Sequence, residues 1–247
     1  GKIFWEQRNN LSSFEKADHF ISLAYQQRKT DFELAILMSK IKYVRAYFLE
    51  KDPVAKDMLY MDASKICKKI VINHPEFKAN YNESVGDSTT KLMAAITNAP
   101  KSTIPGLYWW AVNHAKYLNS KPALERINQR ELLEVIMNRV ISIEPGFNFS
   151  GPYRFFGSLY TRIPGIELSQ SKTYFDQALE SNPEYLGNYV LMAELYHQKA
   201  GNREQFHQSL IKVIETNLTN HPELMTDNFF YQQKAKQLLE NESLLFE

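Results

Sequence analysis

The stretch GPYRFFGSLYTRIPG, residues 151–165, sets one arginine among aromatic side chains. In a helix, Arg154 lies about 100° around the axis from Tyr153, and Ser158 shares its side. A guanidinium presents a planar fork of N–H donors that matches a carboxylate. This pattern favours recognition of an acid by Arg154, with Tyr153 and Ser158 beside it. The alternative is an arginine whose stem lies along apolar surface while its head pairs with a local glutamate or carbonyl.

A second aromatic stretch, IPGLYWWAVNHAKYLN, covers residues 104–119. Trp109, Asn113 and Lys116 fall at i, i+4 and i+7, on one face of the expected helix, and Trp110 lies on the neighbouring face. Two adjacent tryptophans do not both point into one core, so one interpretation places at least one of them in a ligand pocket. In that case Trp109, Trp110, Asn113 and Lys116 contact a ligand. The other interpretation buries both rings between helices.

Residue patterns that carry catalysis or hold metals are poorly represented. The six histidines lie at positions 19, 74, 114, 197, 207 and 221, with no His-x3-His pair and no His-Glu-x-x-His motif. The sequence contains neither a glycine-rich phosphate loop nor a Gly-x-Ser-x-Gly elbow. Cys67 is the only cysteine, which excludes an intrachain disulfide, and its place in a helix favours a buried small hydrophobe. We therefore expect no catalytic residues, no metal and no cofactor.

Charge and length narrow the class of protein further. The chain of 247 residues carries 29 basic and 28 acidic side chains, a net charge of +1. Proteins that neutralise phosphates usually show a clear basic excess, so we expect no nucleic-acid partner. No apolar run approaches the roughly 18 residues that span a bilayer. We expect a single α-helical domain over residues 1–247.

Helix signals run along the whole chain. Ser12 with Glu15, and Thr30 with Glu33, have capping-box spacing ahead of apolar positions at helical period. Asp52 is expected to cap a third helix whose first residue is Pro53. No period-2 alternation bounded by turn residues is present. The sequence predicts an all-α fold.

A proline recurs at the expected ends of helices. It occurs at positions 75, 145, 183 and 222, with separations of 70, 38 and 39 residues. The tetratricopeptide repeat has a period of 34 and closes each helix pair with such a proline. Its first-helix pattern, Trp-x2-Leu-Gly-x2-Tyr, has the spacing of Tyr153, Phe156, Gly157 and Tyr160. Gly157 is then expected where two helices approach too closely for a Cβ atom.

The repeat is degenerate. Residues 78–105 replace part of one unit, and residues 119–129 lengthen the next. An ordinary peptide-binding solenoid has no need of such insertions, so they indicate a site built onto the repeats. We expect a degenerate tetratricopeptide-like superhelix of helical hairpins with insertions.

Three segments resemble, in order and spacing, the TatT family, the T component of tetratricopeptide-associated tripartite ATP-independent periplasmic (TRAP) transporters. They are GLYWWAVNHAKYLN (106–119), GPYRFFGSLYTRIPG (151–165) and NFFYQQKAKQLLENESLLFE (228–247). The similarity covers most of the chain, and the first 50 residues are generic. The family's aromatic helix is matched by Trp109, Trp110 and Asn113. Its second motif is matched by Gly151, Pro152, Tyr153, Arg154 and Gly157.

The resemblance implies a non-catalytic bacterial protein of the periplasm, anchored through a lipidated cysteine. No cysteine precedes Cys67, so that anchor is expected in a segment before residue 1. The implied partner is the periplasmic substrate-binding P subunit, which serves an ion-driven permease. The resemblance also implies a homo-oligomer, with a trimer as the first candidate. Each protomer is expected to hold a small organic ligand, hydrophobic and acidic, in a cleft or channel.

Three functional hypotheses result. In the first, Arg154 holds the acid and Trp109 and Trp110 cover the hydrocarbon of a ligand that a transporter accessory protein binds or passes on. In the second, the chain is a generic tetratricopeptide scaffold that binds a protein segment along its concave face. The third is an enzyme acting on cell-wall or lipid material, which needs an acid/base pair that the sequence does not offer.

Overall fold

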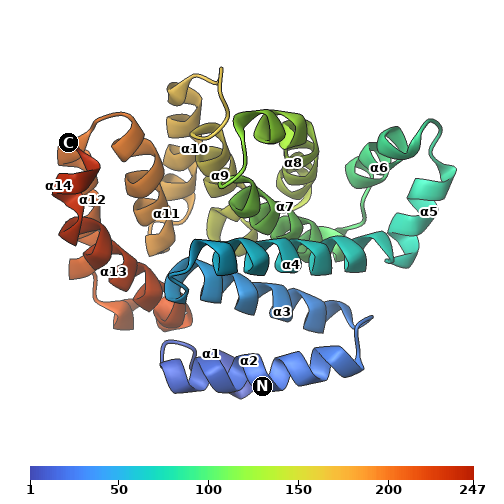
Figure 1. The fold of residues 1–247 in the computed structure, drawn as a ribbon, viewed down its shortest axis with the longest axis horizontal. Coiled ribbons are helices and arrows are strands. Elements are labelled where there is room, and N and C mark those ends of the chain that lie inside the picture. The colour runs from blue at the N-terminus through green and yellow to red at the C-terminus, as the bar shows by residue number, and fades with distance from the viewer. The chain divides into compact units, whose positions relative to one another are not determined.

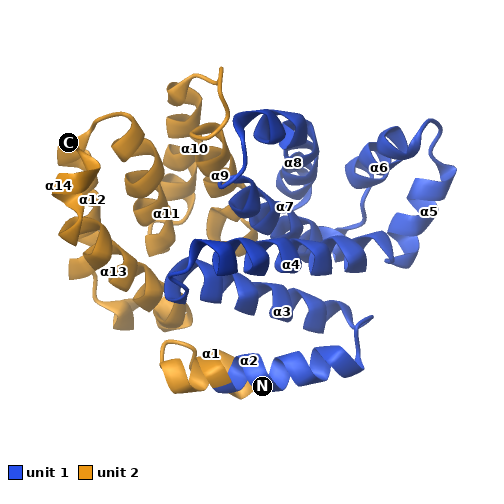
Figure 2. Ribbon diagram, in the orientation of Figure 1, with its two compact units in different colours: residues 1, 16–145 blue, residues 2–15, 146–247 orange.

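The structure is a computed structural model that describes residues 1–247; 81% of it is helical, with 14 α-helices and no strand. The predicted all-α class is confirmed. The chain forms two compact units (Figures 1 and 2). Unit 1 consists of Gly1 and Lys16–Pro145, and unit 2 consists of Lys2–Glu15 and Gly146–Glu247.

Unit 1 contains most of helix α2 and the helices up to α8. Their bounds are α2 Leu11–Gln27, α3 Phe32–Val44, the π-helix η1 Arg45–Leu49, α4 Pro53–Ile72, α5 Pro75–Glu83, α6 Ser88–Thr97, the 3-10 turn η2 Lys101–Thr103, α7 Ile104–Leu118 and α8 Ala123–Ile143.

The helix starts in unit 1 follow from side-chain caps. Asp52 accepts a hydrogen bond from the Ala55 N–H, and Pro53 begins α4, as predicted. The cap predicted at Thr30 is wrong, because Asp31 accepts from the Leu34 N–H. The cap predicted at Ser12 is also wrong, since Asn10 accepts from the Ser13 N–H and α2 begins one residue before Ser12.

Helix α4 is the centre of unit 1. It packs along α3 on one side and along α7 on the other, and α7 packs in turn against α8. The fully buried side chains of this core include Ile41, Phe77 and Trp110. The predicted insertion 78–105 contains α6, which packs against both α5 and α8. The insertion thus forms part of the helical layer of unit 1.

Unit 2 contains the short helix α1, the start of α2 and the helices from α9 onward. Their bounds are α1 Lys2–Glu6, α9 Phe147–Tyr160, α10 Leu168–Ser181, α11 Leu186–Leu191, the π-helix η3 Met192–His197, α12 Arg203–Glu215, the 3-10 turns η4 Leu218–Asn220 and η5 Pro222–Leu224, α13 Met225–Glu240 and α14 Glu242–Leu245.

In unit 2, neighbouring helices along the chain pack side by side. Helix α9 packs against α10, η3 against α12, and α12 against α13. Phe156, Phe175 and Phe206 are fully buried in this core. Arg8, just after α1, donates hydrogen bonds to Asp227 of α13 from Nη2 at 2.6 Å and from Nε at 3.2 Å. This ion pair fixes the N-terminal segment to the rest of unit 2.

The recurring prolines lie where the sequence expected them, two or three residues after the ends of α4, α8 and α10, and after η4. Pro75 and Pro222 also begin the next helical segments, α5 and η5. The side-by-side packing of neighbouring helices and the proline-containing breaks between helices agree with an arrangement of helical hairpins. The tetratricopeptide superhelix itself, and the single domain over residues 1–247, stay predictions.

Candidate functional site

Helix α7 carries the predicted aromatic residues of unit 1, and both tryptophans lie inside the protein. Trp110 is 1% exposed and Trp109 is 7% exposed. The Trp110 ring lies 5.5 Å from the ammonium of Lys68 on α4. The structure therefore agrees with the interpretation that buries both rings between helices.

Trp109 belongs to a cluster of aromatic rings. Its ring meets those of Tyr43 and Tyr108 edge-on, each with 5.3 Å between ring centres, and Tyr43 also stacks on Tyr47 at 5.7 Å. The Lys40 ammonium lies 5.6 Å from the Trp109 ring centre. Although Trp109 is buried, its indole Nε1 has no hydrogen-bond partner. Buried donors are nearly always paired with protein, ordered water or a bound group.

Asn113, one turn along α7, is fully buried. Its amide nitrogen donates to Ser39 Oγ at 3.1 Å and to the Trp109 carbonyl at 2.8 Å. These two acceptors fix the orientation of the amide, and its Oδ1 is left without a partner. An unpaired donor and an unpaired acceptor therefore lie one turn apart on α7.

Lys116, the third residue of the predicted face, is half-buried, with its ammonium 4.2 Å from the ring centre of Tyr47. Tyr47 lies in the π-helix η1. Trp109, Asn113 and Lys116 thus all contact side chains from the segment 39–47, as residues that share one helix face can. The result is a largely apolar aromatic cluster with two lysine ammonium groups, those of Lys40 and Lys116, beside its rings.

The second predicted motif lies in unit 2 and is preceded by an unusual turn. Asn148, Phe149 and Ser150 all have left-handed backbone angles, with φ of 51°, 56° and 59°. Gly151 and Pro152 follow as the start of the right-handed part of α9, and both are buried. A left-handed residue with a side chain costs roughly 1–2 kcal/mol, so this turn needs strong compensating interactions.

Arg154 supplies those interactions. Its Nη1 donates to the Phe149 carbonyl at 2.9 Å and its Nη2 to the Asn148 carbonyl at 3.0 Å. The guanidinium lies 4.6 Å from the ring centre of Tyr185. The residue is only 4% exposed, and its guanidinium pairs with local carbonyls, which agrees with the alternative given for this arginine. Arg154 stabilises the left-handed turn.

The other residues of the motif have separate places. A Cβ on Gly157 would lie 2.8 Å from the Phe175 ring, which confirms close packing of α9 on α10 as the reason for this glycine. Ser158 and Tyr153 are half-buried, and the Ser158 hydroxyl donates to the Arg154 carbonyl at 2.8 Å. The motif and the aromatic helix belong to different units, and their convergence on one cleft stays a prediction.

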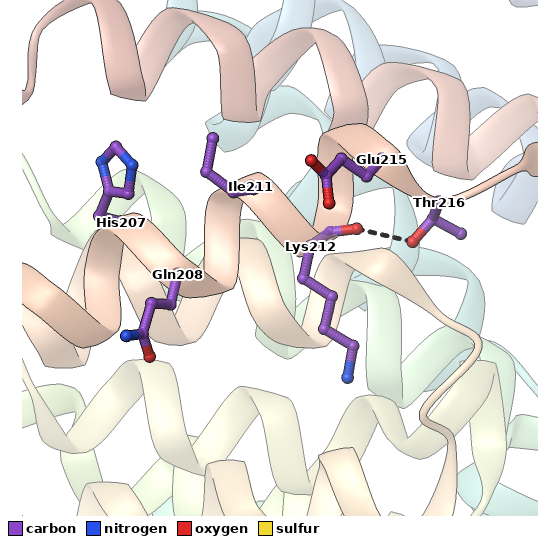
Figure 3. Close-up of a pocket in the computed structure, with 6 residues that line it drawn as sticks. All are labelled: His207, Gln208, Ile211, Lys212, Glu215 and Thr216. Carbon is purple, nitrogen blue, oxygen red and sulfur yellow. Dashed lines mark hydrogen bonds between the residues drawn. The ribbon is translucent and has the colours of Figure 1, made fainter.

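Two hollows lie on unit 2. One is a shallow groove of about 510 Å³ along α12 (Figure 3). Figure 3 shows His207, Ile211 and Glu215 on one side of this helix and Gln208 and Lys212 on the other. The Lys212 ammonium donates to the Tyr189 hydroxyl at 2.9 Å. All lining residues of the groove belong to α12 or directly follow it, so no second helix contributes to its lining.

The other hollow is a cavity of about 270 Å³. It is lined by Thr161, Arg162, Glu194, Leu195, Gln198, Lys199 and Leu245. The sequence reasoning assigned none of these residues to a site. A signal was available, because Arg162 lies in the same stretch as Arg154 and Leu245 lies in the third segment that carries the family resemblance.

No three His, Cys, Asp or Glu side chains come together in a way that would hold a metal ion. No helix combines the length and the apolar character needed to cross a membrane.

Burial lowers the pKa of His114, against the opposing effect of a hydrogen bond with Gln129. This ring is therefore neutral near pH 7.

One comparison with known proteins identifies a family. The family model TAtT, described as TRAP transporter T-component, matches residues 20–246. This range contains α7, α9 with its left-handed turn, and most of the C-terminal segment. A search of curated proteins finds no match.

Proposed function

Because the chain belongs to the TRAP transporter T-component family, we propose that it docks a periplasmic substrate-binding P subunit and binds or passes on a hydrophobic organic acid. In this proposal the protein acts in the periplasm as a non-catalytic, lipid-anchored subunit of a homo-oligomer. The family supports the transport role, and the residues of α7 support the ligand role.

The observation that carries the ligand role is the unpaired donor and acceptor on α7. Trp109 Nε1 offers an N–H, and Asn113 Oδ1 accepts a hydrogen bond. A hydroxyl or an un-ionised carboxyl group satisfies both kinds of atom. The rings of Tyr43, Tyr108 and Trp109 give the apolar contacts that a hydrocarbon needs. Lys116 supplies a positive charge beside this cluster, and in this proposal Trp110 also covers part of the hydrocarbon.

The contacts of Arg154 favour a structural role over the acid-binding role first considered. Its guanidinium is engaged by the carbonyls of the left-handed turn and by Asn188. Contacts of Tyr153, Arg154 and Ser158 with a ligand stay predictions. Equal affinity for the acid in a folded Arg154→Ala variant would exclude that role for the arginine.

Calorimetric titration of the purified chain with the P subunit of a TRAP system from the same genome tests the docking proposal. Saturable binding is expected, and a periplasmic binding protein from an unrelated transporter serves as the control. No binding to the P subunit, together with capture of an extended peptide, would favour the generic tetratricopeptide scaffold instead.

Titration with palmitate, before and after Trp109→Phe, tests the ligand proposal. The substitution keeps an aromatic ring but removes the N–H, and loss of one hydrogen bond is expected to weaken binding by about 2- to 12-fold. Trp5→Phe makes the same chemical change in unit 2 and is expected to leave affinity unchanged. Palmitate affinity that is equal in all three proteins would contradict the assignment to α7.

A further inference from the structure

The cavity of unit 2 has the composition of a binding site for a small anion. Five of its seven lining residues are polar or charged, and the other two are Leu195 and Leu245. Its volume of about 270 Å³ corresponds to about nine waters at roughly 30 Å³ each. It therefore suits a molecule of about ten non-hydrogen atoms or fewer, below the usual size range of drug-sized ligands.

The charges at the cavity are predominantly positive. Arg162 and Lys199 line it, and Glu194 is the only acidic lining residue. The Glu194 carboxylate pairs with Lys234 at 3.0 Å, so its negative charge is offset by a third cation. The Lys199 ammonium donates to the Thr161 carbonyl, and an ammonium has three N–H donors. Arg162 and Lys199 are both exposed, which places the cations at the open side.

The inner wall of the cavity comes from the π-helix η3. Glu194 and Leu195 lie within it, and Gln198 follows directly. A π-helix widens the helical turn and occurs often at functional sites. Leu195 is 7% exposed and gives the lining an apolar surface. The cavity therefore combines a cationic mouth with an apolar wall.

The C-terminal segment closes one side. Leu245 of the one-turn helix α14 lines the cavity, and Figure 1 shows α14 following α13, beside α12. The Glu242 carboxylate accepts hydrogen bonds of 2.7 Å from Arg203 Nε and from His207 Nδ1. The Phe246 ring meets Phe206 edge-on at 5.1 Å. These contacts hold a short helix that has no buried residue of its own, as expected for a low-stability element.

We propose that this cavity binds a short aliphatic carboxylate, with the carboxylate between Arg162 and Lys199 and the alkyl chain against Leu195 and Leu245. The C-terminal segment from Glu242 to Phe246 is the movable wall that admits the ligand. The proposal goes beyond the T-component role, because it uses none of the α7 residues and needs no P subunit.

Calorimetric titration of the whole chain with hexanoate tests the proposal, with hexan-1-ol as the uncharged probe of similar size. Hexanoate is expected to bind, and hexan-1-ol to bind at least about tenfold more weakly, because it lacks the charge that the two cations recognise. Hexan-1-ol affinity equal to that of hexanoate, or no hexanoate binding, would overturn the proposal.

Variants identify the site. Arg162→Gln and Lys199→Gln are each expected to weaken hexanoate binding by about tenfold or more, whereas Lys236→Gln removes an exposed charge of α13 that does not line the cavity and is expected to have no effect. These positions are exposed, so all three variants should fold, which circular dichroism verifies. Unchanged hexanoate affinity in Arg162→Gln and Lys199→Gln would overturn the assignment.

Two further variants test the movable wall and show whether hexanoate binding depends on the α7 site. Glu242→Gln removes the negative charge that Arg203 and His207 share, and should speed hexanoate association and dissociation in stopped-flow measurements. Rates equal to those of the wild type would exclude a movable wall. Trp109→Phe should leave hexanoate affinity unchanged, whereas under the proposed function it weakens palmitate binding. The two proposals can therefore fail independently.

Discussion

Arg154 Nη1 donates a 2.6 Å hydrogen bond to Asn188 Oδ1. The Asn188 amide in turn donates to the carbonyls of Ala178 and Asn182, at 3.0 Å each. Both side chains are buried, Asn188 completely. This pair therefore connects the left-handed turn at the start of α9 to the C-terminal end of α10, where the Ala178 carbonyl also accepts from the Asn182 backbone N–H.

A double-mutant cycle on this pair should show strong coupling. Arg154→Ala and Asn188→Ala each leave buried polar groups unpaired, and we expect each to lower the free energy of unfolding by about 2–4 kcal/mol. The double variant should lose clearly less than the sum, because both substitutions remove the same hydrogen bond. Urea denaturation followed by circular dichroism measures the effect. Strictly additive losses would contradict the connection.

The left-handed turn predicts an inverted preference at Phe149. In a right-handed helix, glycine is about 0.5–1 kcal/mol less favourable than alanine. At φ 56° the order should reverse, with Phe149→Gly more stable than Phe149→Ala by about 1 kcal/mol. Both variants lose the stacking of Phe149 on Tyr185, whose ring centres are 5.0 Å apart, so their difference isolates the backbone. Alanine more stable than glycine would show that the turn is right-handed.

Gly157 offers a test of helix packing with a control in the same unit. Gly157→Ala places a Cβ 2.8 Å from the Phe175 ring and should lower the stability by about 1–3 kcal/mol through overpacking. Gly146→Ala meets no atom within 4 Å, and its φ of −80° is ordinary for alanine. Thermal unfolding of both variants should show a clear loss only for Gly157→Ala. Phe175→Leu in the Gly157→Ala background should recover part of it.

Cys67 predicts a loss of stability at alkaline pH. Burial raises the pKa of its thiol from the usual 9.0 to about 12, against a hydrogen bond with Ser39 that lowers it. The folded state thus keeps the proton at pH values where the unfolded state releases it. This contribution is complete below pH 9 and is lost as the pH rises from 9 towards 12. In urea denaturation at several pH values, Cys67→Ala should lack this part of the decline in the free energy of unfolding.

The burial of Cys67 also predicts a slow reaction. Iodoacetamide should alkylate the wild-type thiol slowly at pH 8, and fast alkylation would contradict its burial.

The sequence predicted those features of the fold that depend on local pattern. Helical periodicity and the absence of alternation gave the all-α class, and Asp52 with Pro53 marked the start of α4. At α2 and α3 the predicted caps were displaced by two residues and one residue, to Asn10 and Asp31. Several residues there have side chains able to cap a helix. Only the path of the backbone decides which one reaches a free N–H.

The candidate sites were less predictable, because they depend on tertiary contacts. Asn148, Phe149 and Ser150 contain no glycine to mark a left-handed turn, so the need for Arg154 to stabilise it was hidden. The spacing of Trp109, Asn113 and Lys116 correctly predicted a shared face. It gave no sign that Asn113 is completely buried, which depends on α3 and α4. Arg162 and Leu245 are 83 positions apart in the sequence, and only the fold brings them to one cavity.

Each unit contains one π-helix, η1 in unit 1 and η3 in unit 2. A π-helix holds about one residue more per turn than the α-helix around it, which is equivalent to a one-residue insertion. Removing one residue from η3 would turn every later side chain of that helix by about 100°, and Gln198 and Lys199 would leave the cavity. The lining of this site therefore depends on the number of residues in η3 as well as on the identity of the lining residues.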